Sequence, residues 1–188
     1  QPIRDDSRRA ALVANGEIYN YRDLAIPLQR RYQFRTRSDS ETILHLFSDC
    51  QTAAAAGLDG MFAFAIAEGD DLFAARDPLG IKPLYYCRLP DRFIFASEIK
   101  TLLCQLTRQP QIRPRALAEF LQNQFNTGRK TIFEGIERVL PGECLVIDTG
   151  LNVTRRRYWR PQQAAPRDIG MPEAMAEFEQ LFRQVFQV

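Results

Sequence analysis

The feature that most constrains this chain is a series of four short strand-like segments between residues 60 and 96. Two of them flank a predicted turn at 68–71, and the other two flank a predicted turn at Pro90-Asp91. Apolar segments joined by short polar turns are typical of antiparallel hairpins. Helix-like segments lie before and after this series instead of alternating with its strands. This order predicts an α+β domain in which antiparallel sheet is layered with helices.

The composition excludes several classes of function. The chain has 188 residues, 45% hydrophobic and 26% charged, which is enough to bury a core. Its net charge of +2 provides no broad positive field for nucleic acid or an anionic membrane. The apolar run at Met61–Ala67 is too short to span a bilayer. We therefore expect a soluble, cytoplasmic protein with neither nucleic acid nor membrane as a partner.

The cysteines and the single histidine predict no metal site. The four cysteines contain no C-x-x-C pair, so we expect reduced, buried thiols instead of a zinc cluster or a disulfide framework. His45 is the only histidine, and we expect it to have a structural role on the side of a helix.

The Asn15-Gly16 pair, which follows an apolar segment, can be interpreted in two ways. Asn-Gly is a turn signal, so the strand is expected to end there, before a helix that Asn20 caps and Pro27 shortens. In the first alternative this is only a surface turn. In the second, the turn holds the Asn15 side-chain amide and the Gly16 N–H where negative charge develops in a reaction.

A second helix start is predicted at 38–41. Ser38 and Glu41 have the spacing of a capping box, and Asp39 lies in the predicted first turn, where a carboxylate is favoured by the helix dipole. Asp39 has a functional role only if a substrate cation lies in front of it. The alternating segment Tyr32–Arg37, which precedes this start, predicts a strand.

The second half of the chain predicts further helices and one hairpin. Ser97 is expected to cap a helix through Leu106, and Pro114 is expected to open another. A hairpin is predicted to turn at 149–152, and the arginines at 155–157 after it are expected to form a solvated face.

Both ends of the chain suggest a part of a longer protein. After a polar segment, the residues from Pro172 onward place apolar side chains on one helical face, and little chain remains to cover them. We interpret 161–188 as a linker and the first helix of an absent second domain. The first residue is Gln1 and not Met, and we expect an N-terminal part to be missing.

Five motifs occur in a characteristic order: "NGEIYN", "SDSETIL", "LDGMFAFAI", "ARDPLGIKPLYY" and "FASEIKTLL". Together they resemble the class II glutamine amidotransferase domain of glutamine-hydrolysing asparagine synthetases, from about Leu12 to Trp159. The resemblance implies that residues 1–160 form such a domain. It also implies the fold of the N-terminal-nucleophile hydrolases, an αββα sandwich of antiparallel sheets between helical layers, incomplete here at the N-terminus.

The resemblance also implies a reaction and its residues. Glutamine is hydrolysed to glutamate and ammonia by a cysteine at the mature N-terminus, whose α-amino group is the base. Asn15 and Gly16 match the oxyanion hole, and Glu17 and Asp39 match the acidic residues that hold the substrate α-ammonium. The nucleophilic cysteine and an upstream arginine for the substrate carboxylate have no counterpart among these residues.

The implied partner is a C-terminal synthetase domain that uses ATP and Mg²⁺ to amidate aspartate or a related carboxylate. No cofactor is expected in the domain itself, and a homodimer of the parent is compatible with the resemblance. The alternative is a non-catalytic module that binds glutamine or docks a synthetase domain. For the loop Asp77–Tyr86, a rigid connection and a role for Lys82 facing a channel both stay open.

Overall fold

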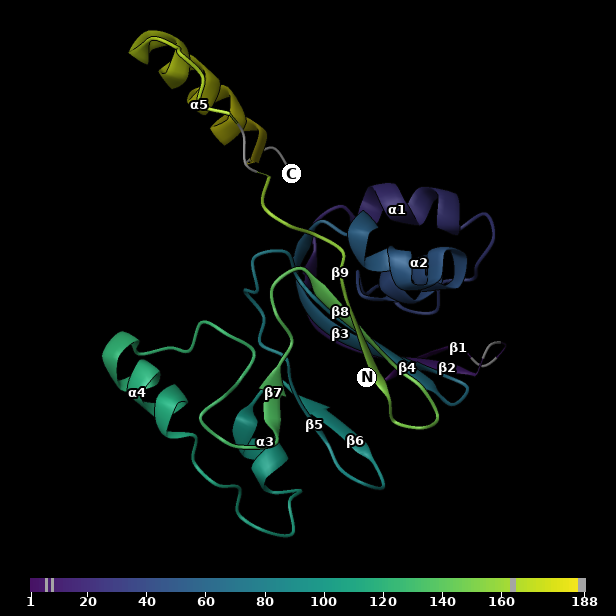
Figure 1. Cartoon of the computed structure of the whole chain (residues 1–188). Coiled ribbons are helices and arrows are strands. Elements are labelled where there is room, and N and C mark those ends of the chain that lie inside the picture. Colours follow the sequence, from purple (N-terminus) through teal and green to yellow (C-terminus); the bar gives the residue numbers. More distant parts are fainter. Residues whose placement is uncertain (6, 8, 163–164, 186–188) are drawn as a thin grey trace.

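A six-stranded antiparallel sheet forms the centre of the computed structural model, which describes residues 1–5, 7, 9–162 and 165–185 (Figure 1). Its strand order is β1-β2-β3-β4-β8-β9. These strands are β1 (Ile3–Asp5), β2 (Ala10–Ile18), β3 (Gly60–Glu68), β4 (Asp71–Arg76), β8 (Glu143–Ile147) and β9 (Val153–Arg157). The predicted hairpins at 68–71 and 149–152 are confirmed by the β3–β4 and β8–β9 pairs.

A second, three-stranded sheet has the order β6-β5-β7. It consists of β5 (Tyr85–Arg88), β6 (Phe93–Ala96) and β7 (Ile136–Arg138). The predicted hairpin at Pro90-Asp91 is confirmed by the β5–β6 pair. The loop between Arg76 and Tyr85 therefore carries the chain from one sheet to the other.

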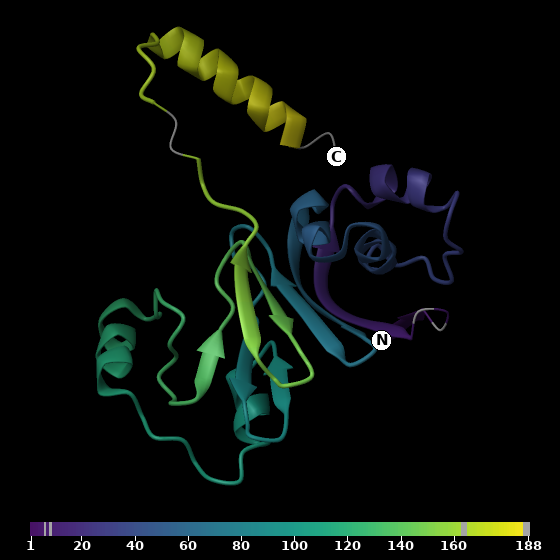
Figure 2. The same ribbon diagram turned by 45° about the vertical axis from the view of Figure 1, so that its right-hand side comes forward.

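Helices cover the outer faces of the two sheets (Figures 1 and 2). The helix α2 (Glu41–Cys50) packs with α1 (Tyr21–Leu28) and the 3₁₀ helix η1 (Gln51–Gly57) on the large sheet. The short α3 (Ile99–Leu103) packs on the small sheet, and α4 (Pro114–Asn123) begins at the predicted proline.

The side chains of β3 show how these layers are specified. Phe62, Phe64 and Ile66 point into the core beneath α2. Ala63 and Ala65, on the opposite face, pack in the core between the two sheets, where small side chains allow close approach. A third cluster, around Cys87, Leu102 and Ile136, joins the small sheet to α3. The predicted α+β fold of antiparallel sheets between helical layers is confirmed.

The strand β2 does not end at Asn15-Gly16, so that prediction is wrong. It continues to Ile18, and Gly16 pairs with Phe62 of β3. Gly16 has a φ of +147°, and a Cβ there would lie 2.0 Å from the carbonyl oxygen of Met61. Glycine is therefore required by the close approach of β3 and not by a turn.

The predicted strand at Tyr32–Arg37 is also wrong. The carboxylate of Glu41 accepts hydrogen bonds from the backbone amides of Arg35 and Thr36, both at 2.7 Å, and from Thr36 Oγ1 at 2.6 Å. In a strand, the backbone amides of Arg35 and Thr36 would have to pair with a neighbouring strand, but here they donate to Glu41. Because Glu41 is used in this way, the predicted capping box with Ser38 is absent, although the predicted helix does form from Glu41.

Neither Asn20 nor Ser97 caps a helix through its side chain, contrary to prediction. The Asn20 amide instead binds the backbone of Gly57 and Asp59, which fixes the turn after β2. The helix α1 does end early, one residue after Pro27.

All four cysteines are free, but only Cys87 and Cys144 are buried; Cys50 and Cys104 are exposed, which corrects the expectation of four buried thiols. His45 is 4% exposed, with its ring stacked on Tyr32 at 4.9 Å and tilted against Phe34 at 4.6 Å, which fits the expected structural role.

The last helix, α5 (Met171–Val185), stands apart from the layered body in Figures 1 and 2. No residue of α5 is buried, and Met175, Phe178, Leu181 and Phe182 are all more than half exposed. Phe186, expected on the same face, lies outside the described residues. In the described part of the chain, no helix has both the length and the apolar character needed to cross a bilayer.

Candidate functional site

Two of the predicted site residues, Glu17 and Asp39, line one open pocket of about 490 Å³. Glu17 lies near the end of β2, and Asp39 lies just before α2. The pocket is bounded by the end of β2, the start of α1 and residues 37–39. The structure therefore brings together two carboxylates that are 22 positions apart in the sequence.

Asp39 is fixed in this pocket by the main chain. Its Oδ2 accepts the backbone N–H of Ile18 at 2.7 Å, and its Oδ1 accepts the N–H of Ser40 at 2.8 Å. The first bond ties residues 37–39 directly to the end of β2, beside Glu17. The carboxylate is thus already oriented before any ligand binds, which lowers the entropic cost of binding.

Glu41 supports the same segment from the other side. Burial opposes its ionisation, but the hydrogen bonds from Thr36 and from the amides of Arg35 and Thr36 outweigh burial and lower the pKa of Glu41. Glu41 is 2% exposed, so this ionised side chain anchors the segment from inside the fold.

Two cations that the sequence analysis missed, Arg22 and Arg37, line the pocket with the carboxylates. Arg37 directly precedes Ser38 and Asp39 in the sequence. This position next to a predicted site residue was the signal that could have identified Arg37 as a pocket residue. A pocket lined by both carboxylates and guanidinium groups suits a zwitterion, because carboxylates bind an ammonium group and guanidinium groups bind a carboxylate.

Asn15 lies in a neighbouring crevice of about 140 Å³ and not in the pocket of Glu17 and Asp39. Asn15 and Glu17 are two residues apart on one strand, so they point to the same face of β2. The crevice runs between the sheets, and its walls include Ala63 and Ala65 of β3 and Ser97 after β6. Asn15 Nδ2 lies 3.4 Å from Ser97 Oγ, a contact that the sequence analysis missed because it assigned Ser97 to a helix cap.

The loop after β4 uses its charged residues internally. The Arg76 guanidinium donates to the carbonyl oxygens of Lys82, Gly80 and Val139 at 2.6 to 2.8 Å. The Asp77 carboxylate accepts the amides of Leu79, Ile81 and Lys82 at 2.9 to 3.1 Å.

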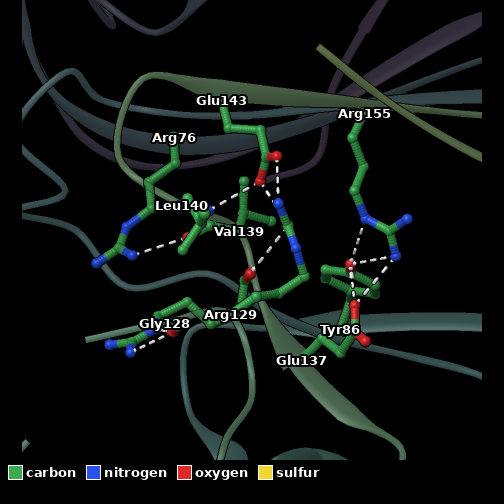
Figure 3. A network of polar contacts seen from close by, with 10 residues as sticks. Arg76, Tyr86, Gly128, Arg129, Glu137, Val139, Leu140, Glu143 and Arg155 are labelled. Carbon is green, nitrogen blue, oxygen red and sulfur yellow. Dashed lines mark hydrogen bonds and ion pairs between the residues drawn. The ribbon is translucent and has the colours of Figure 1, made fainter. Parts of the chain in front are cut away.

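Figure 3 shows that the Arg76–Val139 bond belongs to a wider polar network between the sheets, in which Arg129 binds Glu143, and Arg155 binds Tyr86 and Glu137. These contacts support the interpretation of this loop as a rigid connection.

None of the four cysteines lines the pocket or the crevice in the described part of the chain. Among the same residues, no group of three or more histidine, cysteine or acidic side chains has the arrangement of a metal site. The described residues thus supply hydrogen-bond donors and charges around a pocket, while a thiol nucleophile is not placed beside them.

Comparison with known proteins identifies the family of this chain. Residues 1–159 match the family described as glutamine amidotransferase domain. Two asparagine synthetases (glutamine-hydrolyzing) of Bacillus subtilis, numbers 1 and 3, are 36% identical over 163 residues and 35% identical over 181 residues. These alignments cover 85% and 92% of this chain but only 26% and 28% of the relatives. The chain thus spans about a quarter of the length of these relatives.

Among solved structures, the glutamine phosphoribosylpyrophosphate amidotransferase of B. subtilis matches with a TM-score of 0.58 at 24% identity. The match covers 86% of this chain and 32% of that one. This likeness shows the fold, which is that of the N-terminal-nucleophile amidotransferases. The family match and the two relatives go further, and the chain belongs to the glutamine amidotransferase family, as a class II domain of the asparagine synthetase type.

Proposed function

We propose that this domain hydrolyses glutamine to glutamate and ammonia as one part of an asparagine synthetase-like enzyme. The observation that carries the proposal is the pocket in which Glu17 and the anchored Asp39 lie next to the crevice of Asn15. Two carboxylates facing one ammonium form charge-assisted hydrogen bonds, which favour an α-amino acid over a simple amide.

In the proposed reaction, Asn15 and Gly16 stabilise the oxyanion. When a thiolate attacks the side-chain carbonyl of glutamine, negative charge develops on the carbonyl oxygen. The Asn15 Nδ2–H and the Gly16 N–H are the proposed donors to that oxygen. The carbon–nitrogen bond then breaks as the leaving nitrogen takes up the proton that the thiol gave to its base, and ammonia leaves. Water hydrolyses the resulting thioester to glutamate and the free thiol. Because none of the four cysteines lines either pocket in the part of the chain that the structure describes, we propose that the thiolate is supplied by a cysteine of the parent protein outside these 188 residues.

The proposed partner of the domain is an ATP-dependent synthetase domain that amidates aspartate or a related carboxylate. We propose that ATP and Mg²⁺ bind there and that this domain binds only glutamine. The exposed apolar face of α5 supports this assignment, because a helix with six large apolar residues exposed needs a further surface to pack on. We place α5 and the residues before it in the linker and first helix of that partner domain.

The test is glutamate and ammonia release from glutamine by the full-length protein that carries this domain. We expect Asn15→Ala to lower kcat by about 100- to 1,000-fold with little change in KM, since the amide contacts charge that exists mainly in the transition state. Asn126→Ala is the matched control, because the Asn126 amide binds Ala116 O and Glu119 outside the site. Equal kcat in wild type and Asn15→Ala would refute the oxyanion role.

The competing function is a non-catalytic glutamine-binding module. It predicts that the full-length protein binds glutamine, as measured by calorimetry, and releases no ammonia. Ammonia release in the wild type that Asn15→Ala abolishes would exclude this alternative.

A further inference from the structure

We propose that Ser97 is a positioning residue that orients the Asn15 carboxamide for glutamine hydrolysis. The inference rests on the proposed function of Asn15 as an oxyanion donor and adds a second residue to it. It starts from the contact between Asn15 Nδ2 and Ser97 Oγ, which is 3.4 Å long and joins residues 82 positions apart.

This contact connects the two sheets. Asn15 lies on β2 of the large sheet, and Ser97 directly follows β6 of the small sheet. Both residues line the crevice between the sheets, which is otherwise walled mainly by alanine, leucine and phenylalanine side chains. Gln1, the other polar residue of this crevice, uses both its amide oxygen and its amide nitrogen on the backbone of Ala14. Among the described residues, the Ser97 hydroxyl is therefore the crevice group placed to set the rotation of the Asn15 amide.

The local fold does not explain Ser97. A serine at the N-cap position usually caps its helix, but Glu98 occupies that position in α3, no side-chain cap is formed, and Ser97 lies one residue earlier. Ser97 is half-buried and its hydroxyl faces Asn15. A hydroxyl that caps no helix and contacts a carboxamide of the other sheet is best explained by that carboxamide.

The chemical argument concerns the rotation of the amide. The terminal torsion of asparagine has a broad, two-fold preference, so an unheld carboxamide populates orientations that present either its oxygen or its nitrogen. The amide has two N–H groups. If Ser97 Oγ accepts one of them, the nitrogen side stays toward the site and the second N–H is available to an oxyanion. An amide turned to the opposite orientation would present its oxygen, which repels the developing charge.

The experiment is a double-mutant cycle in the full-length protein, with glutamine hydrolysis as the readout. We expect Ser97→Ala to lower kcat by about 3- to 10-fold, the range of one neutral hydrogen bond, with KM nearly unchanged. Ser97→Thr, which keeps the hydroxyl, should retain most of the activity. In the Asn15→Ala background, Ser97→Ala should have no further effect, because the amide that it orients is gone.

Two further variants separate positioning from general effects. Ser97→Cys keeps the volume of the side chain but is a weak acceptor, so it should resemble Ser97→Ala even if the alanine variant folds poorly. Ser48→Ala removes a hydroxyl that binds Leu44 O within α2, away from both pockets, and should leave kcat unchanged.

A loss of kcat on Ser97→Ala that is the same with and without Asn15 would overturn the inference. So would full activity of Ser97→Cys and Ser97→Ala. A wild-type protein that releases no ammonia would instead refute the proposed function, and the role of Ser97 with it. Activity that depends on Asn15 but not on Ser97 would leave the proposed function in place and refute only the positioning role.

Discussion

Two segments of this chain have similar sequence character and opposite roles in the structure. In both, polar or charged residues follow apolar residues of a strand: Asn15-Gly16-Glu17 on β2, and Arg76-Asp77 at the end of β4. Asn15 and Glu17 are exposed, whereas Arg76 is 7% and Asp77 is 0% exposed. The first segment leaves its side chains exposed at the crevice and the pocket, and the second uses them on its own backbone.

The difference lies in where the backbone finds its hydrogen-bond partners. Residues 78–82 form no ladder, so their amides and carbonyls need the side chains of Asp77 and Arg76. Asn15 and Glu17 lie within a paired strand, whose ladder serves the backbone and leaves the side chains available. A polar motif inside a ladder is therefore the better candidate for ligand binding.

The largest expected effect tests the internal role. Asp77→Ala removes the acceptor of three loop amides in a buried position, and we expect the free energy of unfolding to fall by about 3 to 5 kcal/mol, measured by urea denaturation. Asp91→Ala, in an exposed turn, is the control. If the free energy of unfolding falls by less than about 1 kcal/mol, water replaces the Asp77 carboxylate as the acceptor of the loop amides. The internal role of the Arg76-Asp77 segment would then be weaker than its burial indicates.

The next effect tests the ligand-binding role. Asp39→Asn removes the charge from the contact to the proposed ammonium, so KM for glutamine should rise by about 10- to 100-fold, which corresponds to about 1.5 to 3 kcal/mol. A thermal midpoint measured on the same variant provides the control, because the neutral amide would also weaken the bonds to the N–H groups of Ile18 and Ser40. A lower midpoint with an unaltered KM would remove Asp39 from the site and leave Glu17 alone.

A smaller effect is expected at Glu41. Like Asp77, this buried carboxylate binds backbone amides, but the segment that it holds leads to the proposed ligand-binding residue Asp39. We expect Glu41→Gln to lower the free energy of unfolding by about 1 to 2 kcal/mol at neutral pH, because it loses charge-assisted bonds. The pKa of Glu41 is below its ordinary value of 4.5 in the folded state. Its contribution is therefore fully present above pH 4.5 and is lost as the pH falls through the lowered pKa.

Urea unfolding of wild type and Glu41→Gln across this pH range checks the sign. The difference between them should shrink as the solution becomes more acidic. Glu134→Gln, at an exposed position, should show no such pH-dependent difference. A gap that grows on acidification would show that burial and not hydrogen bonding governs Glu41.

The smallest effect is expected at Lys82. The hydrogen bonds given for Lys82 use its backbone N–H and carbonyl, so Lys82→Ala should change the free energy of unfolding by less than about 0.5 kcal/mol. Synthesis of the amidated product by the full-length protein is the second readout. A normal stability with a large loss of glutamine-dependent synthesis would favour the alternative in which Lys82 faces a channel.

Local signals were sufficient to predict much of the fold. The hairpins of β3–β4, β5–β6 and β8–β9 follow from apolar segments and turn residues that are neighbours in the sequence. The layered α+β arrangement follows from the order of these elements. The pairing of Glu17 with Asp39 was predicted through the family resemblance, and the structure places both in one pocket.

The predictions that were wrong depend on partners far along the chain. Gly16 was assigned to a turn because the close approach of Met61 cannot be deduced from neighbouring residues. Ser97 was assigned to a cap, but its hydroxyl contacts Asn15 of the other sheet. In the same way, the strand predicted at Tyr32–Arg37 fails because Glu41 binds the amides of Arg35 and Thr36.

The amide that holds Asp39 is a property of the polypeptide and not of the side chain at position 18. Every amino acid except proline has a backbone N–H, so point mutation of Ile18 leaves this donor in place in nearly every case. Mutations there act on the core, where Ile18 is 2% exposed, and reach Asp39 only by shifting the strand. The orientation of the Asp39 carboxylate is therefore insensitive to most changes of the side chain at position 18. Ile18→Pro is the single substitution that removes the donor itself.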